Sequence, residues 1–292
     1  MFIDNIEIAI NGRFFKIARL RHEKFEFSEN PLELIEKLRR GKSVPDLFTF
    51  VQDTCDERIY SGFVKKLEGA SFLPITTHEQ WWKALDFKVR NKIRKAQKSG
   101  VELRPAILND EFVKGVQSIY DESPFRQGRK FVHYGKSLQT LKGDLSSFPE
   151  CTFFIGAYYQ SELIGFMKLF EGNKVLRTVH IIAKISHRDK PVMDALISRA
   201  VEICEQKKFA YLHYGSWTGG GLGDFRIKHG FKRFEVPRYF VPLTFRGKLA
   251  LKLNLHYELR ERLPEKWTEK LLALRKRALA LLDRSTKRFK TS

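Results

Sequence analysis

The sequence predicts an α/β (α+β) fold in which a mixed, mainly antiparallel sheet is flanked by helices. Residues 151–185 contain three consecutive strand-like segments separated by short polar turns, a pattern typical of an antiparallel meander. Residues 191–207 repeat apolar side chains at helical spacing between two strand-like segments. This second pattern indicates a crossover helix that packs on the sheet.

The N-terminal segment begins with two apolar strand-like runs around an Asn-Gly pair (residues 11–12), which favours a two-residue hairpin turn. Asn30 followed by Pro31 predicts the start of a short helix that ends at Gly41. Residues 46–52 mix Leu, Phe, Thr and Val, so we expect them to form the next strand.

The middle of the chain continues this alternation of helices and strands. Thr77 has capping-box spacing to Gln80 and predicts the start of one helix that runs to Gly100. A strand over 101–108 and a helix over 110–122 follow. The next predicted elements are a strand at 209–215 and a glycine-rich loop at 216–223 that leads to a short helix. This loop is a lid, a close-approach loop or a loop with no ligand role. A strand at 239–243 and an amphipathic helix from about Glu265 follow.

The charge of the chain limits the classes of partner that it is expected to bind. The chain carries 54 Lys and Arg against 34 Asp and Glu, a formal net charge of +20, which favours nucleic acid, a phosphorylated cofactor, an acidic carrier protein or a membrane surface. Cys55, Cys151 and Cys204 lack metal-ligand spacing, which argues against a metal site or a disulfide framework. Without a signal-peptide or membrane-span pattern, we expect a cytoplasmic protein, or a peripheral one at the inner membrane face.

Three segments carry a family resemblance: WWKALDFKVRNKIRKAQKSGVEL (81–103), AYYQSELIGFMKL (157–169) and KISHRDKPVMDALISRAVEICEQKKFAYLHYG (184–215). The first is similar to a segment of Fem-type peptidyltransferases. The second resembles the central hairpin of GNAT N-acyltransferases, and the third resembles their strand, phosphate-binding loop and long helix. FRIKHGF (225–231) has the outline of the element that follows. The chain thus resembles the Fem-like branch of the GNAT superfamily.

The resemblance implies a GNAT-like sheet and three parts of the chain. These are an N-terminal α/β extension packed on the core (1–71), an acyltransferase domain (72–243) and a basic helical C-terminal extension (244–292). Two parallel strands, here about 175–184 and 209–215, would splay apart. A backbone N–H in the opening would polarise the donor carbonyl, while the loop and helix start hold phosphates.

The implied activity is N-acyltransfer from acyl-CoA, as co-substrate, or from another acyl-thioester such as an acyl-carrier, to an amine acceptor. The acceptor of such enzymes is in some cases a cell-envelope precursor. In the Fem branch the donor is aminoacyl-tRNA, and this is the first alternative. An alternative of another class is a non-catalytic module that binds nucleic acid or membrane, which the net charge of +20 favours. Nothing in the sequence fixes the oligomeric state.

The resemblance places the donor site on the loop before helix 191–207. The donor-binding candidates are Ala183, Lys184, Ile185, Ser186, His187, Arg188, Lys190 and Arg226. This loop contains no glycine, so Arg188 and Lys190 would supply charge where related loops supply amides. The catalytic candidates are His180, His213 and Tyr214, and each histidine is alternatively a structural, hydrogen-bonded residue.

Two further groups are candidates for binding. The acceptor candidates, which alternatively belong to an ordinary surface loop, are Arg126, Arg129 and Tyr134. The anion or RNA candidates, on a helix whose basic face is alternatively only solvated, are Arg90, Arg94 and Lys95. The helix from about Glu265 would lie on an anionic membrane or dock on the protein's own core.

Overall fold

The structure is a computed structural model that describes residues 1–254 apart from residues 5, 24–27, 29, 54, 55, 57 and 127. The predicted helix from Glu265 lies outside the described residues. Among those described, no helix is long and apolar enough to cross a membrane.

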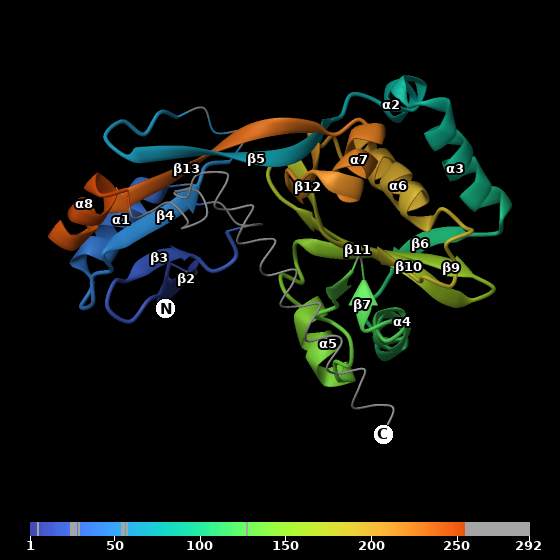
Figure 1. Ribbon diagram of the computed structural model, residues 1–292, viewed down its shortest axis with the longest axis horizontal. Helices are drawn as coiled ribbons and strands as arrows, with labels where there is room; N and C mark the ends of the chain where they lie inside the picture. The colour runs from blue at the N-terminus through green and yellow to red at the C-terminus, as the bar shows by residue number, and fades with distance from the viewer. Residues whose placement is uncertain are drawn as a thin grey trace.

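The described chain folds into strands and helices that alternate as Figure 1 shows. The strands are β1 (Phe2–Ile3), β2 (Ile6–Asn11), β3 (Ile17–Leu20), β4 (Leu47–Val51), β5 (Val64–Pro74), β6 (Glu102–Ala106), β7 (Phe125–Arg126), β8 (Arg129–Lys130), β9 (Thr152–Tyr159), β10 (Glu162–Glu171), β11 (Val175–Ala183), β12 (Tyr211–Ser216) and β13 (Lys232–Pro242). The helices are α1 (Pro31–Arg40), α2 (His78–Ala84), α3 (Phe87–Lys98), α4 (Asp110–Tyr120), α5 (Leu138–Leu145), α6 (Val192–Gln206), α7 (Gly220–Lys228) and α8 (Phe245–Lys252).

One sheet runs through the whole described molecule, in the strand order β1-β2-β3-β4-β13-β5-β12-β11-β10-β9-β6. Among the described strands, only the β3–β4 and β11–β12 pairs are parallel, so the prediction of a mixed, mainly antiparallel sheet is confirmed. The long β5–β13 pair joins the N-terminal strands to the remaining ones (Figure 1).

The strands beyond β5 in this order, from β12 to β6, have helices on both faces of the sheet. α3 packs on α6, and α6 packs on β10, β11 and β12. Their core contains Leu169, Leu176 and Leu196, each fully buried. On the opposite face α4 packs on β10 and α5, around Phe166 and Ile119. Since burial of apolar area is the main stabilising force, these two cores fix β10 and β11 between the helix layers.

The N-terminal part has a core of its own. The predicted hairpin is present as β2 and β3, but the register Asn11↔Ile17 leaves five residues between the strands and corrects the expected two-residue turn. The predicted helix is α1, with Asn30 accepting a hydrogen bond from the Glu33 amide at its cap. α1 packs with β2, β3 and β4 in a cluster that also includes Tyr239 of β13.

Two local predictions are wrong for identifiable reasons. The helix predicted from Thr77 to Gly100 is two helices, because Asp86 caps α3 by accepting the Lys88 amide at 2.7 Å. The glycine-rich stretch is not wholly a loop, because Gly220 begins α7. Strand β5 and the helices α5 and α8 were not predicted.

Candidate active site

The parallel strands β11 and β12 pair over only three residues, Val175↔Tyr211, Leu176↔Leu212 and Arg177↔His213. Beyond Arg177, β11 stays paired with β10 up to Ala183. Strand β12 instead follows β5. The sheet therefore opens between β11 and β12, and the predicted splay is confirmed.

The register of β11 shows which amides face this opening. A bulge at Val179 separates the pairs Leu169↔Thr178 and Lys168↔His180. Downstream, the Lys184 amide donates to the Ile164 carbonyl on β10 at 2.7 Å. Residues of an antiparallel strand point their backbone groups alternately to its two sides. The N–H groups of Ile181 and Ala183 therefore point away from β10, towards the edge that β12 has left.

A cavity of about 620 Å³ lies at this opening. It is bounded by the end of β11, the loop over 184–191, the start of α6, and side chains from α3 and the segment around β7 and β8. Six of the donor-binding candidates line it: Ala183, Lys184, Ile185, His187, Arg188 and Lys190. Further lining residues are Lys92, Phe125, Arg126, Phe131, His180, Ile181, Ile182, Pro191, Val192, Met193 and Asp194. The charged groups in this lining are mostly cationic.

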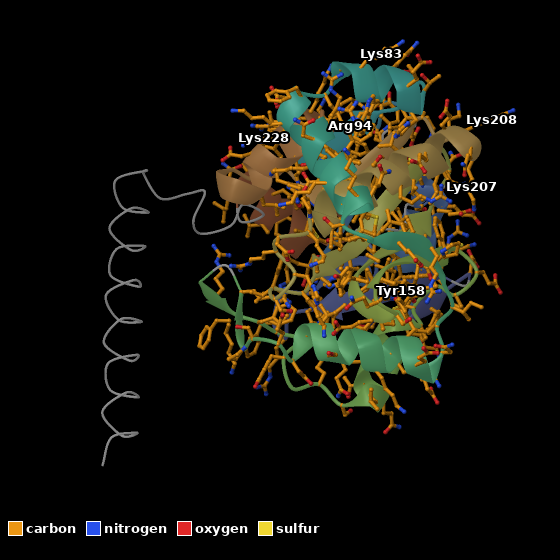
Figure 2. All side chains as sticks on the ribbon, turned by 90° about the vertical axis from the view of Figure 1, so that its right-hand side faces the viewer. Lys83, Arg94, Tyr158, Lys207, Lys208 and Lys228 are labelled. Atoms are coloured by element: carbon orange, nitrogen blue, oxygen red, sulfur yellow. The ribbon has the colours of Figure 1, made fainter. Side chains whose placement is uncertain are left out.

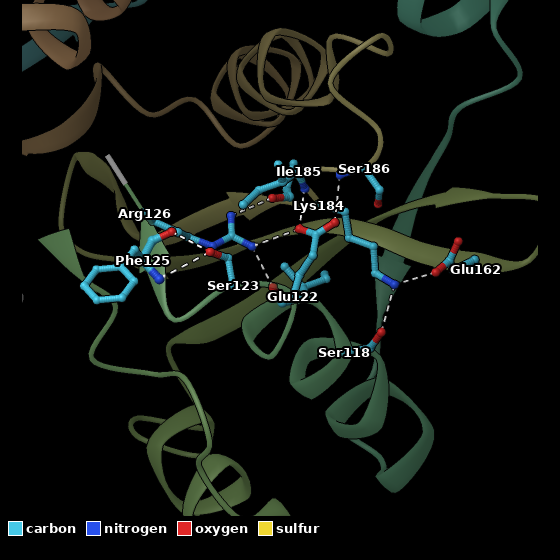
Figure 3. Close-up of polar contacts among 11 residues, drawn as sticks. Ser118, Glu122, Ser123, Phe125, Arg126, Glu162, Lys184, Ile185 and Ser186 are labelled. Atoms are coloured by element: carbon cyan, nitrogen blue, oxygen red, sulfur yellow. Dashed lines mark hydrogen bonds and ion pairs between the residues drawn. The ribbon is translucent and has the colours of Figure 1, made fainter. Parts of the chain in front are cut away.

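A carboxylate holds the first part of the loop (Figure 3). Glu122, just after α4, accepts hydrogen bonds from the amides of Ile185 and Ser186, the latter at 2.7 Å. Although burial opposes ionisation, these hydrogen bonds lower the pKa of the Glu122 carboxyl below its usual value. Glu122 is therefore a charged anchor for the loop at neutral pH.

Arg126 completes this anchor. Its Nη1 donates to the Ala183 carbonyl at 2.9 Å, and its Nη2 donates to the Ile119 carbonyl at 2.6 Å. The same Nη2 lies 3.3 Å from Glu122. Arg126 thus lines the cavity, but its Nη1 and Nη2 groups bind other protein groups. It is therefore a residue that positions the end of β11.

The other cations of the cavity differ in how they are paired. Lys184 donates to Glu162 and to Ser118, and Lys190 pairs with Asp189 at 2.8 Å. The side chains of Lys92 and Arg188 are exposed and have no hydrogen-bond or ion-pair partner within the described residues. These two cations are available to bind a phosphate.

The three catalytic candidates lie in different surroundings. His180 lines the cavity, and its buried Nε2 has no hydrogen-bond partner in the described part of the chain. His213 does not line the cavity and packs on the Phe72 ring, with centroids 4.6 Å apart. Burial lowers the pKa of both histidines to about 3, so both are neutral and weakly basic at neutral pH.

Tyr214 also lies outside the cavity lining. Its ring packs against Phe231 in the α6 core, and the guanidinium of Arg226 lies 4.6 Å from its centroid. Burial raises the pKa of Tyr214 to about 12, so the hydroxyl is a poor acid near neutrality. Arg226 does not line the cavity either, and its Nη1 donates to the Ser216 carbonyl at 2.7 Å.

The binding candidates outside the donor loop are mostly at the surface. Arg129 and Tyr134 are exposed and do not line the cavity, in contrast to Arg126. Arg94 lies on α3 with its guanidinium 5.3 Å from the Trp82 ring, on the side seen in Figure 2. Lys95 is exposed in the last turn of α3.

Arg90 is half-buried, and its Nε has no hydrogen-bond partner among the described residues. It does not line the cavity, whereas Lys92 on the same helix does. The basic helix therefore contributes to the cavity through a residue outside the three candidates.

Sequence reasoning missed Phe125, Phe131 and Glu122. Lys92 belongs to the basic run of α3, which the sequence indicates as an anion-binding or a solvated face, but it is not among the three candidates drawn from that run. No local pattern in the sequence points to Glu122, because its partner, the Ile185 amide, lies 63 residues further along the chain.

With this geometry established, the fold is GNAT-like and Fem-related. Among solved structures, the chain is similar to FemX, with a TM-score of 0.59, 8% identity, and 84% of this chain and 86% of that chain covered. It is similar to L-PGS from Bacillus licheniformis, with a TM-score of 0.53, 14% identity and 80% of both chains covered. A third similar structure is the C-terminal domain of a protein described as a lysylphosphatidylglycerol synthetase, from Agrobacterium fabrum, with a TM-score of 0.55, 13% identity and 85% and 82% covered. No family model and no curated protein matches the sequence.

Proposed function

We propose that this protein is a transferase that moves an acyl group from an activated thioester or ester to an amine. The observation that carries the proposal is the opening between β11 and β12, where the N–H groups of Ile181 and Ala183 lie at the edge of a cavity lined by cations. Amide hydrogens fixed in this way stabilise the negative charge that develops on a carbonyl oxygen under attack.

The reaction needs few side chains. The amine nitrogen attacks the donor carbonyl carbon, a C–N bond forms, and the C–S or C–O bond to the leaving group breaks. The proton that the amine loses passes to solvent or to the leaving group. His180 stays neutral beside the carbonyl, since its pKa is about 3, and so it places no cation against an approaching amine.

The first donor candidate is an acyl-thioester, either acyl-CoA or an acyl-carrier, whose phosphate would pair with Lys92 and Arg188 at the cavity. The second is an aminoacyl-tRNA, favoured by fold similarity to FemX and to the lysylphosphatidylglycerol synthetase domain above a TM-score of 0.5. We propose an amine of a cell-envelope precursor as acceptor, with peripheral membrane contact. The non-catalytic alternative predicts binding without turnover.

A proline substitution tests the backbone amide. Ile181→Pro removes the N–H that faces the opening, and its side of β11 has no strand partner there, so the ladder to β10 survives. Loss of one such donor costs about 10²- to 10³-fold in kcat. The matched control is Ile182→Pro, which removes a ladder amide and should destabilise the fold instead.

The donor class is tested by thermal shift with acyl-CoA, acyl-carrier protein and aminoacyl-tRNA, followed by turnover with a panel of amines. A ligand that binds only the native state raises its melting temperature. We expect one donor to do so and to be consumed. Salt-dependent RNA or vesicle binding, with no donor consumed, would instead establish the binding module.

A further inference from the structure

The loop that begins at Lys184 contains a small anion receptor that the protein has filled with its own carboxylate. The amides of Ile185 and Ser186 are consecutive, and both donate to Glu122, one to each carboxylate oxygen (Figure 3). Consecutive N–H groups that converge on one acidic group form the arrangement by which loops bind phosphate oxygens. The occupant here is a side chain.

The Glu122 carboxylate is held in place by the two amides and by Arg126. Glu122 is about one-fifth exposed, at 19% of its side chain, and Arg126 lies 3.3 Å from the same oxygen that accepts the Ile185 amide. Arg126 is itself tied to the carbonyls of Ile119 and Ala183. The carboxylate is therefore a fixed negative charge beside the cavity.

A bound phosphate would meet two obstacles at this loop. It would have to displace Glu122 from the two amides, and it would then face that carboxylate at short range, where like charges repel strongly. Other positions in this loop also lack a free amide: Pro191 has no N–H, and the amides of Arg188, Lys190 and Val192 donate to backbone carbonyls. Lys92 and Arg188 remain as cations for phosphate binding.

We propose that Glu122 is a specificity-determining residue that excludes donors bound through a pyrophosphate on the loop amides. Among the donors proposed above, this disfavours acyl-CoA, which carries a pyrophosphate. It favours an acyl-carrier or an aminoacyl-tRNA, whose phosphates are single phosphodiesters that Lys92 and Arg188 would bind. This inference rests on the proposed function only in calling the ligand an acyl donor. The affinity of the loop for an anion can be measured without any turnover.

The test uses the full chain, titrated with inorganic pyrophosphate in a calorimeter at fixed ionic strength. Glu122→Gln keeps the side-chain shape and removes its charge, so we expect the affinity for pyrophosphate to rise at least about tenfold. The matched control is Glu162→Gln, which removes a carboxylate bonded to Lys184 on the same loop but bonded to neither amide. Because this substitution frees Lys184, its affinity should also rise, but by less than that of Glu122→Gln.

Equal pyrophosphate affinity in the unaltered protein and in Glu122→Gln overturns the proposal, as does an equal gain in Glu162→Gln. If Glu122→Gln does not fold, amide NMR of the unaltered protein decides. The Ile185 and Ser186 resonances must stay in place as pyrophosphate is added, and a saturable shift of both overturns the proposal. A gain for Glu122→Gln with no turnover of any donor would uphold the specificity claim and refute the transferase.

Discussion

Gly165 on β10 allows β11 and α6 to approach each other at the cavity. A Cβ at this position would lie 2.7 Å from Val192 Cγ1, 3.1 Å from the Ile182 carbonyl oxygen and 3.2 Å from Ala183 Cβ. Val192 is a buried, β-branched residue at the start of α6, so relieving the contact requires an unfavourable rotamer or a shift of the helix. Overpacking of this kind costs about 1–3 kcal/mol, and we expect Gly165→Ala to destabilise the protein by that amount.

The control is Gly143→Ala in α5, where the new Cβ meets nothing within 4 Å. Alanine is the better helix former, so this variant should gain about 0.5–1 kcal/mol. Urea unfolding followed by circular dichroism measures both free energies of unfolding. If Gly165→Ala is as stable as the unaltered protein while Gly143→Ala behaves as expected, the steric reasoning is wrong. Because Val192 and Ala183 line the cavity, donor affinity should also fall in Gly165→Ala.

Three other predictions concern the cavity and its surroundings. Lys92→Ala and Arg188→Ala should each weaken donor binding, with a shallower salt dependence than the unaltered protein, whereas Lys83→Ala on the exposed side of α2 should bind normally in the same titration. The pKa of Glu122 is lower in the folded state than in the unfolded state, where it has its usual value of about 4.5. Its contribution to stability is therefore complete above that value and is lost as the pH falls through the folded-state pKa. Between about pH 6 and about pH 3, the melting temperature of the unaltered protein should fall more than that of Glu122→Gln. Tyr214→Phe should retain turnover within about twofold, because the hydroxyl is outside the cavity and its pKa is about 12; a large fall in kcat would restore Tyr214 as an acid.

The sequence was informative where the determinants are close together along the chain. Helix α6 follows from its own apolar periodicity, and six donor-binding candidates line the cavity together because they are neighbours in one loop. His213 and Tyr214 were placed near the donor by strand order. Strand β12 diverges at that point, so both residues lie away from the cavity.

Other features depend on contacts that no local pattern encodes. The apolar stripe continues from Leu85 to Val89 across the break between α2 and α3. The sequence pattern therefore predicts one continuous helix and does not reveal that Asp86 caps α3. Strand β5 lacks clear alternation because its first half is only partly buried and only its last residues enter the core, from Ser71 to Leu73.

The β4–β13 pairing has a consequence for how the protein is made. Arg238 donates to Thr49, 189 residues earlier, and Tyr239 stacks on Phe50 with ring centroids 5.3 Å apart. In a nascent chain, Phe50 and its neighbours in this core therefore lack their partners Tyr239 and Val241 until β13 has left the ribosome. Contacts this distant in sequence form slowly, and the waiting apolar surface is a target for chaperones and for aggregation.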